Sequence, residues 1–189
     1  MTNILKQYII SQLGDDIDNL EYVLSKFQCL KVKRNSQLLT QGEICKYIYF
    51  VAEGSLQSYI YDTEMIENTR EIVTEGNWYS DLRSFNNCVP AIENIRAIEP
   101  SLLYQVNNKD FQEMIKTIPQ FGKVYQKILE AYYTSAVYRV NTFISLSALD
   151  RMKWLMQHRP DLMTRFPSKM IASYLGINKD VFSRLKAKL

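Results

Sequence analysis

The last segment of the chain, IASYLGINKDVFSRLKAKL (residues 171–189), carries side chains that can recognise another molecule. Placed on a helix at about 100° per residue, Asp180, Ser183 and Arg184 fall on one side. An α-helix fits the major groove of DNA, where arginine can donate to guanine O6 and N7 and a carboxylate can accept from cytosine N4. This face can therefore read bases, although a solvated basic face on an ordinary amphipathic helix gives the same pattern.

Two short helices must hold this face in place. Their apolar stripes are Ile171, Ala172 and Leu175 in the first, and Phe182, Leu185 and Leu189 in the second. Gly176 lies where the first helix must end in a left-handed residue, and Asn178 can cap the second by accepting a hydrogen bond from a backbone N–H. The pattern predicts a helix, a tight turn and a second helix that share one small core.

Positive charge is concentrated at this end of the chain. The formal net charge is +3, but residues 168–189 alone carry five Lys or Arg residues against one Asp, so the remainder is slightly negative. Phosphate neutralisation supplies most of the non-specific affinity of proteins for nucleic acids. The uneven charge therefore indicates a polyanion as the partner of the C-terminal segment only.

Composition excludes several other classes of protein. With 189 residues, of which 47% are hydrophobic, the chain can form one good-sized domain or two small ones. No targeting peptide or membrane-spanning run is visible, so we expect a cytoplasmic protein. Cys29, Cys45 and Cys88 form no C-x-x-C pair and His158 is the only histidine, so we expect no metal site. Without a nucleophile–base pair or a Gly-rich phosphate loop, we expect no enzyme.

The first two thirds of the chain read as short helices followed by strands. Residues 4–27 have helical spacing interrupted by a Gly-Asp-Asp sequence at 14–16. The stretch YIYFVAEGSLQSYIY indicates two strands with a turn at Glu53-Gly54, and further strands are expected at 69–73, 92–98 and 102–106. Several short strands separated by turns indicate an antiparallel barrel or roll.

A long helix is expected from residue 120 to about 143, after a short helix ending near Pro119. It has two apolar rows, and one row can pack on the barrel while the other faces a second subunit; the row with coiled-coil spacing could instead lie on the chain's own barrel. The first row, which has coiled-coil spacing, is Phe121, Tyr125, Ile128 and Tyr132; the second includes Val124, Leu129, Ala131 and Ala136. A further helix is expected from Ser145 or Ser147 to just before Pro160.

This order of parts resembles the Crp/Fnr family of bacterial transcription regulators. The resemblance is carried by LLTQGEICKYIYFVAEGSLQSY, which is similar to a β-hairpin motif of the family, and by IASYLGINKDVFSRLKAKL, which is similar to its recognition motif. It implies an α+β fold: an antiparallel, cyclic-nucleotide-binding-like β-roll over 1–118, a dimerisation helix over 119–144 and a helix-turn-helix over 145–189.

The resemblance also implies partners and contact residues. Double-stranded DNA would be read by a homodimer at a pseudo-palindromic site, with RNA polymerase as a candidate partner. Lys179, Asp180 and Arg184 match the base-contacting positions, while Ser168 would cap the first helix and lie with Lys169 near the phosphates, if they are not merely a cap and a solvated charge. The full expected DNA-binding set is Ser168, Lys169, Asn178, Lys179, Asp180, Ser183, Arg184 and Lys188. The expected dimer contacts are Phe121, Tyr125, Ile128 and Tyr132.

Two departures from the family pattern stand out. The sequence ends at Leu189 without the β-hairpin wing that usually follows the recognition helix, which predicts modest DNA affinity. In the effector pocket, Asp81 matches a Glu that holds ribose, whereas Ala91 and Ile92 match the Arg and Ser that clamp the cyclic phosphate. The degenerate pocket comprises Ser80, Asp81, Leu82, Ala91 and Ile92. We therefore expect no cofactor and no cyclic AMP binding.

One alternative function stays open at this point. The chain could be a sensor or protein-interaction module whose helix-turn-helix no longer reads DNA. Sequence-specific binding that persists as salt rises distinguishes the two, because non-specific phosphate contacts weaken steeply with salt.

Overall fold

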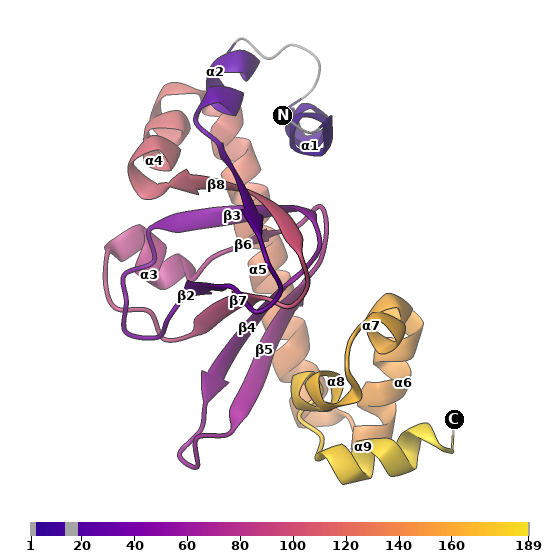
Figure 1. Cartoon of the computed structure of the whole chain (residues 1–189). Coiled ribbons are helices and arrows are strands. Elements are labelled where there is room, and N and C mark those ends of the chain that lie inside the picture. Colours follow the sequence, from indigo (N-terminus) through magenta and orange to yellow (C-terminus); the bar gives the residue numbers. More distant parts are fainter. Residues whose placement is uncertain (1–2, 14–18, 189) are drawn as a thin grey trace. The chain divides into compact units, whose positions relative to one another are not determined.

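The computed structural model describes residues 3–13 and 19–188 (Figure 1). They fall into two compact units. The first comprises Met1–Ile60 and Ile72–Glu130, and the second Tyr61–Glu71 and Ala131–Leu189. The boundary between the units thus falls within the long helix, and the segment 61–71 belongs to the C-terminal unit. The domain boundaries expected from the sequence lie at 118/119 and 144/145.

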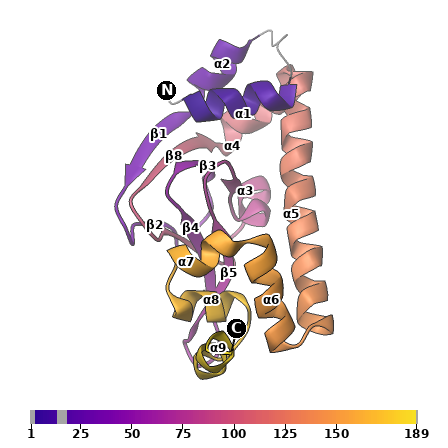
Figure 2. The same ribbon diagram turned by 90° about the vertical axis from the view of Figure 1, so that its right-hand side faces the viewer.

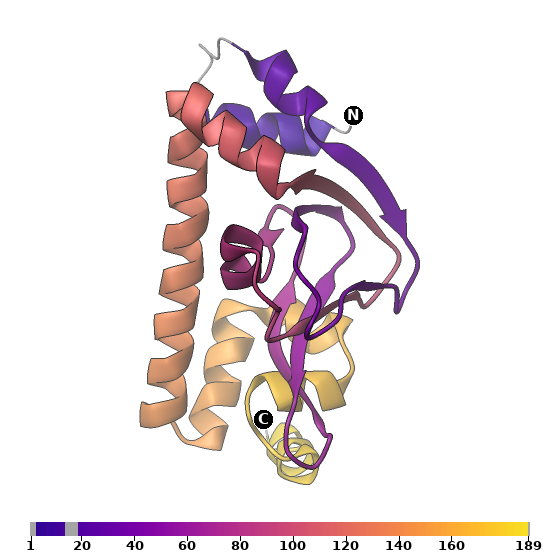
Figure 3. The same cartoon turned by 90° about the vertical axis from the view of Figure 1, so that its left-hand side faces the viewer.

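Two four-stranded antiparallel sheets form the β-roll, as expected (Figure 3). The strand order of the first sheet is β1 (Gln28–Val32), β8 (Ser101–Asn107), β3 (Tyr47–Glu53) and β6 (Trp78–Tyr79). The strand order of the second is β2 (Gln37–Leu39), β7 (Asn94–Ala97), β4 (Leu56–Tyr61) and β5 (Glu67–Val73). β3, β4 and β8 are buried along most of their length, and Phe50, Ile95 and Leu103 are fully buried.

The turn at Gly54 does not close a hairpin. β3 and β4, which it connects, belong to different sheets, so the chain crosses from one sheet to the other. Gly54 has a φ of 85°, and a Cβ atom at this position would overlap Ser101. Glycine is therefore required by both the backbone conformation and the close approach of β8.

Short helices pack on the roll: α1 (Asn3–Leu13), α2 (Leu20–Ser25), α3 (Leu82–Asn87) and α4 (Asn108–Thr117). α1 is attached through aromatic rings, since Tyr8 lies 5.2 Å from Phe50 and 5.8 Å from Trp78 between ring centroids. The predicted break at 14–16 lies outside the described residues. Sequence analysis missed α3 and the short or irregular strands β1, β2 and β6, whose few residues show little periodicity.

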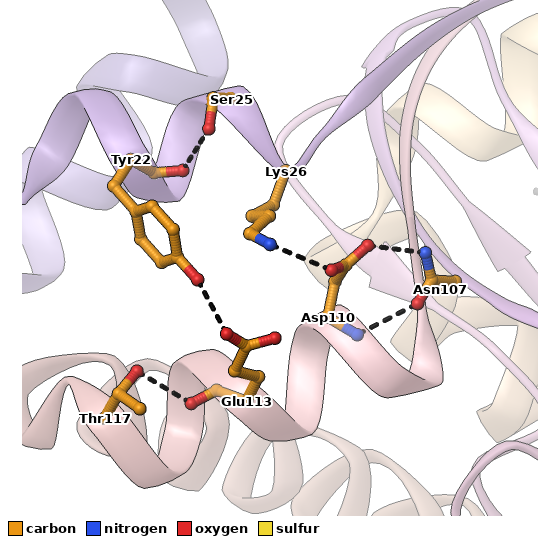
Figure 4. Close-up of polar contacts among 7 residues, drawn as sticks. All are labelled: Tyr22, Ser25, Lys26, Asn107, Asp110, Glu113 and Thr117. Atoms are coloured by element: carbon orange, nitrogen blue, oxygen red, sulfur yellow. Dashed lines mark hydrogen bonds and ion pairs between the residues drawn. The ribbon is translucent and has the colours of Figure 1, made fainter.

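Polar contacts fasten α2 to α4 (Figure 4). Lys26 Nζ lies 3.0 Å from Asp110 Oδ1, and the Tyr22 hydroxyl donates to Glu113 Oε1 at 3.1 Å. Asn107 caps α4 by accepting from the backbone N–H of Asp110, and its amide donates to Asp110 Oδ2 at 2.6 Å. The hydrogen bond from Lys26 lowers the pKa of Asp110, and the same contact raises the pKa of Lys26.

The long helix α5 spans Pro119–Ser145, close to the predicted range. Its first half packs inside the first unit, where Phe121, Val124 and Ile128 are buried. Phe111 of α4 contacts both Phe121 and Tyr125 edge to face, with each pair of ring centroids 5.4 Å apart. These buried side chains come from both predicted apolar rows, so one side of the first half of α5 is covered within the same unit.

The second unit contains the end of α5 and four further helices. These are α6 (Ala148–His158), α7 (Pro160–Arg165), α8 (Ser168–Tyr174) and α9 (Lys179–Lys186). Figure 2 shows α6 beside the end of α5, where the rings of Tyr138 and Trp154 are 4.9 Å apart. Ser147 caps α6 as expected, but Pro160 begins α7 instead of a loop, because proline fits the first position of a helix.

Candidate nucleic-acid interface

The turn between α8 and α9 has the geometry of a helix C-cap. Gly176 is left-handed, with a φ of 61°, and the backbone N–H of Ile177 donates to Ala172 O at 2.8 Å. The N–H of Gly176 donates to Ser173 O at 3.0 Å, which completes a Schellman motif. A side chain at Gly176 would overlap the ring of Phe143. The predicted helix, tight turn and helix are present.

Asn178 and Phe182 fix the second helix of the motif. The Asn178 side chain accepts from the backbone N–H of Asp180 at 2.8 Å, so the predicted N-cap is present. Phe182 is 1% exposed and Leu185 is half-buried, which turns this side of α9 inward. Leu189, the third member of the predicted stripe, lies outside the described residues.

All eight residues of the predicted DNA-binding set have exposed side chains. Four of them lie on α9: Asp180 and Arg184 lie opposite Phe182, Ser183 lies about 100° from it, and Lys179 lies at the exposed start of the helix. The Ser183 hydroxyl donates to Lys179 O at 3.0 Å, and Arg184 Nε makes a long 3.4 Å contact with Asp180 O. The outer face therefore presents an exposed guanidinium, ammonium and carboxylate on one rigid helix.

Ser168 does not cap α8. The N-cap position is occupied by Pro167 without a side-chain hydrogen bond, and Ser168 is the first helical residue. Proline fixes a φ near −65°, which suits the entry into a helix without a capping hydroxyl. Ser168 and Lys169 are exposed at this helix start. Their expected contact with phosphate is thus sterically open, while the capping role is wrong.

A cluster of arginines and aromatic rings packs against the turn between α8 and α9. Sequence analysis missed this cluster. Arg151 of α6 lies over the Phe143 ring at 5.1 Å and reaches Gly176 O at 3.4 Å. Arg139 of α5 lies over Phe143 at 5.3 Å and over Tyr174 at 4.9 Å. Burial raises the pKa of the Tyr174 hydroxyl. The cluster joins three helices, so no periodicity within one segment could reveal it.

In the β-roll, the carboxylate of Asp81 accepts hydrogen bonds from two backbone N–H groups. It caps α3 by accepting from Ser84 N at 2.9 Å, and its second oxygen accepts from Ile92 N at 2.9 Å. Ala91 is buried, while the side chain of Ile92 is 48% exposed. The predicted pocket residues are therefore brought together around an internal carboxylate.

The other predicted pocket residues also have structural roles. The Ser80 hydroxyl donates to Tyr47 O at 3.1 Å, and Leu82 is half-buried at the start of α3. Nearby in the sequence, Glu93 is 5% exposed, and its carboxylate accepts hydrogen bonds from the hydroxyls of Tyr79 and Ser58. Sequence analysis missed this buried acid, because its hydroxyl partners lie on β4 and β6.

The exposed row of α5 differs from the expected dimer contacts. Phe121 and Ile128 are 0% and 3% exposed within their own chain, and the Tyr125 hydroxyl accepts from Asn86 at 2.8 Å. Tyr125 and Tyr132 are half-buried, so this row is less exposed than another row of the same helix. We call the exposed residues the outer row: Leu129 at 39%, Tyr133 at 72%, Val137 at 39%, Val140 at 55% and Ile144 at 80%.

Two further properties limit the chemistry of the described residues. No helix among them is long and apolar enough to cross a membrane. No group of three or more His, Cys, Asp or Glu side chains among residues 3–13 and 19–188 could hold a metal ion.

Comparisons with known proteins agree with this architecture. Residues 29–118 match the cyclic nucleotide-binding domain family. The cAMP-activated global transcriptional regulator CRP of Salmonella typhimurium is 22% identical over 176 residues, which cover 88% of this chain and 84% of the relative. Residues 29–118 therefore resemble a cyclic nucleotide-binding domain, and the resemblance to CRP extends over most of the chain.

Solved structures resemble nearly the whole chain. The c-di-GMP responsive global regulator CLP of Xanthomonas campestris has a TM-score of 0.72 and 14% identity, covering 90% of this chain and 89% of that one. FixK2 of Bradyrhizobium japonicum has a TM-score of 0.74 and 14% identity, covering 86% and 84%. The chain therefore has the fold of these regulators.

Proposed function

We propose that this protein is a homodimeric transcription regulator that reads a pseudo-palindromic DNA site with α9. The observation that carries the proposal is the capped helix α9, which exposes Lys179, Asp180, Ser183 and Arg184 while Phe182 anchors its other side. A forked contact from Arg184 to guanine and an acceptor contact from Asp180 to cytosine N4 suit these groups. A regulator of chromosomal DNA would work in the cytoplasm, with RNA polymerase as a candidate partner.

The outer row supports a dimer. Its spacing of four, four, three and four residues lies on one side of a helix, and a contiguous apolar stripe on a surface commonly marks an interface. Burying Tyr133, Val140 and Ile144 against a second copy would remove apolar side chains from water. The two α9 helices of such a dimer would enter major grooves about one helical turn apart.

The effector of this regulator, if there is one, is not a cyclic nucleotide held by a phosphate clamp. Ala91 and Ile92 offer no cation or hydroxyl, Asp81 already uses the backbone N–H of Ile92, and Glu93 places a carboxylate inside the roll. Burying a phosphate without a paired cation and hydrogen bonds costs several kcal/mol. Arg96 does not replace the clamp, because it stacks over Tyr59 and donates to Gln57.

Selection of bound sequences from random DNA, with and without a metabolite extract of bacterial cells, tests the proposal. We expect a two-fold-related pair of half-sites, and gel shifts of the selected site should keep their preference over scrambled DNA as salt rises. A protein whose binding shows no sequence preference at any salt concentration would instead be the sensor or interaction module with an inactive helix-turn-helix.

A further inference from the structure

Side chains of α5 and α8 bind the outer edge of β5 through hydrogen bonds. β5 is the terminal strand in its sheet order, and the backbone groups along the edge of such a strand need other partners. The backbone N–H of Thr69 donates to Ser173 Oγ of α8 at 2.8 Å, and Thr69 O accepts from the Arg139 guanidinium of α5 at 2.9 Å. Thr69 is 2% exposed, so this peptide group is enclosed.

Neighbouring contacts extend this docking along the strand. Ser173 Oγ also lies 3.5 Å from Glu67 O, so one hydroxyl spans two alternate residues of β5. The Ser135 hydroxyl of α5 donates to Glu71 Oε2 at 3.3 Å. All these residues belong to the second unit, to which segment 61–71 is assigned. We call Thr69, Arg139 and Ser173 the β5 bridge.

We propose that the β5 bridge sets the angle between the dimer helix α5 and the recognition helix α9, and thereby the half-site spacing that the dimer accepts. Arg139 lies on the same helix as the outer row, and Ser173 lies in the last turn of α8, just before the turn at Gly176 from which α9 starts. Thr69 connects the two through opposite ends of its backbone. This inference rests on the proposed function, since spacing has meaning only for a dimer that reads two half-sites.

The bridge supports binding and does not block it. Its contacts on the motif are with α8, whereas the side chains on the outer face of α9 are exposed. Loosening the bridge should therefore leave base preference within a half-site intact and weaken discrimination between spacings. One inserted base pair moves the second half-site by about 3.4 Å along the DNA axis and about 35° around it, so a rigid dimer must discriminate against it.

Two variants of the full chain separate the contacts. Ser173→Ala removes the acceptor for Thr69 N–H, and Arg139→Met removes the donor to Thr69 O while keeping an apolar stem. Ser145→Ala is the matched control for the first, because the Ser145 hydroxyl bonds only Asn141 O of its own helix among the contacts seen. Lys153→Met, an exposed residue of α6, controls for the loss of one positive charge. Arg139→Lys keeps a hydrogen-bond donor and the positive charge, so it should retain part of the spacing discrimination that Arg139→Met loses.

Hydrogen exchange of residues 67–73 is measured first, followed by binding to selected half-sites at spacings from two base pairs shorter to two longer. We expect faster exchange in Ser173→Ala and a loss of spacing discrimination of about three- to tenfold, the effect of one hydrogen bond, in both bridge variants. The controls should match the wild type.

Unchanged exchange, or faster exchange with unchanged spacing discrimination, would overturn this inference alone. A wild-type protein that selects no sequence would overturn the proposed function and this inference with it.

Discussion

Polar side chains in the interior of the β-roll have internal hydrogen-bond partners, whereas the charged side chains of α9 are exposed to solvent. In the roll, the Asp81 carboxylate occupies two backbone amides, and two hydroxyls bind Glu93. On α9, Lys179 and Arg184 extend into solvent. A region whose polar groups are satisfied internally gains little from a polar ligand, whereas exposed charged groups can still pair with one, although ordering their long side chains costs entropy. The comparison favours the proposal that the C-terminal unit recognises DNA through its surface.

The largest effect should come from a charge on the inward row of α5. Ile128→Glu buries an unpaired carboxylate and should lower the free energy of unfolding by about 4 kcal/mol or more. Tyr133→Glu, on the outer row, should leave unfolding almost unchanged and split the dimer at micromolar concentration. Urea unfolding and light scattering measure the two effects. A stable, dimeric Tyr133→Glu variant would reject the outer row as the interface.

Asp81→Ala tests whether the roll depends on its internal carboxylate. The variant loses the cap of α3 and the acceptor for Ile92 N–H, and we expect about 2 kcal/mol less stability in urea. Asp81→Asn, which keeps one acceptor oxygen, should lose about half as much. Equal stability of all three proteins would show that the carboxylate contributes nothing to the fold.

Arg184→Ala should abolish base preference at one step of each half-site, at a cost of about 1 to 3 kcal/mol. Lys186→Ala, whose side chain can reach at most the DNA backbone, should weaken all sequences alike and reduce the salt slope by about one unit. Competition binding with single-base variants of the selected site measures both. An unchanged ranking of sites in Arg184→Ala would refute the orientation of α9 in the groove.

Asp110→Asn should change only the stability of the roll, and only slightly, with a fall in melting temperature of about 1 to 3 °C at neutral pH. Because the folded-state pKa of Asp110 lies below its ordinary 3.8, the ion pair stabilises the fold above that value and its contribution disappears as pH falls through the folded pKa. The folded-state pKa of Lys26 is raised above 10.5, so Lys26 stays charged and the ion pair persists until the pH rises through that folded-state pKa. Melting curves of both proteins should therefore converge in acid; a difference that persists at pH 2 contradicts this assignment.

Cyclic AMP should have no effect. A ligand present at 100 times its Kd stabilises a fold by about 2.7 kcal/mol, which is several degrees for a protein of this size. We expect no shift in melting temperature with millimolar cyclic AMP and no change in DNA affinity. A clear rise in melting temperature that disappears in Arg83→Ala or Arg96→Ala would show that one of these arginines supplies the phosphate clamp.

Much of the C-terminal motif could be predicted because its determinants are local. The left-handed Gly176, the Asn178 cap and the inward Phe182 follow from backbone preferences and helical spacing within a few residues. The long helix and the clearest strands were equally accessible through periodicity. The capping role assigned to Ser168 failed because Pro167 enters the helix without a capping side chain.

The sequence by itself determined which elements form and which side of α9 is polar, since capping, turn chemistry and periodicity act over short stretches of chain. Only the tertiary structure decided which side of α5 is buried, because the buried residues come from both predicted rows and depend on packing against α4. It also decided that Thr69 joins α5 to α8, through partners 70 and 104 residues away. Contacts at such separations depend on the packing of whole elements, which no local pattern encodes.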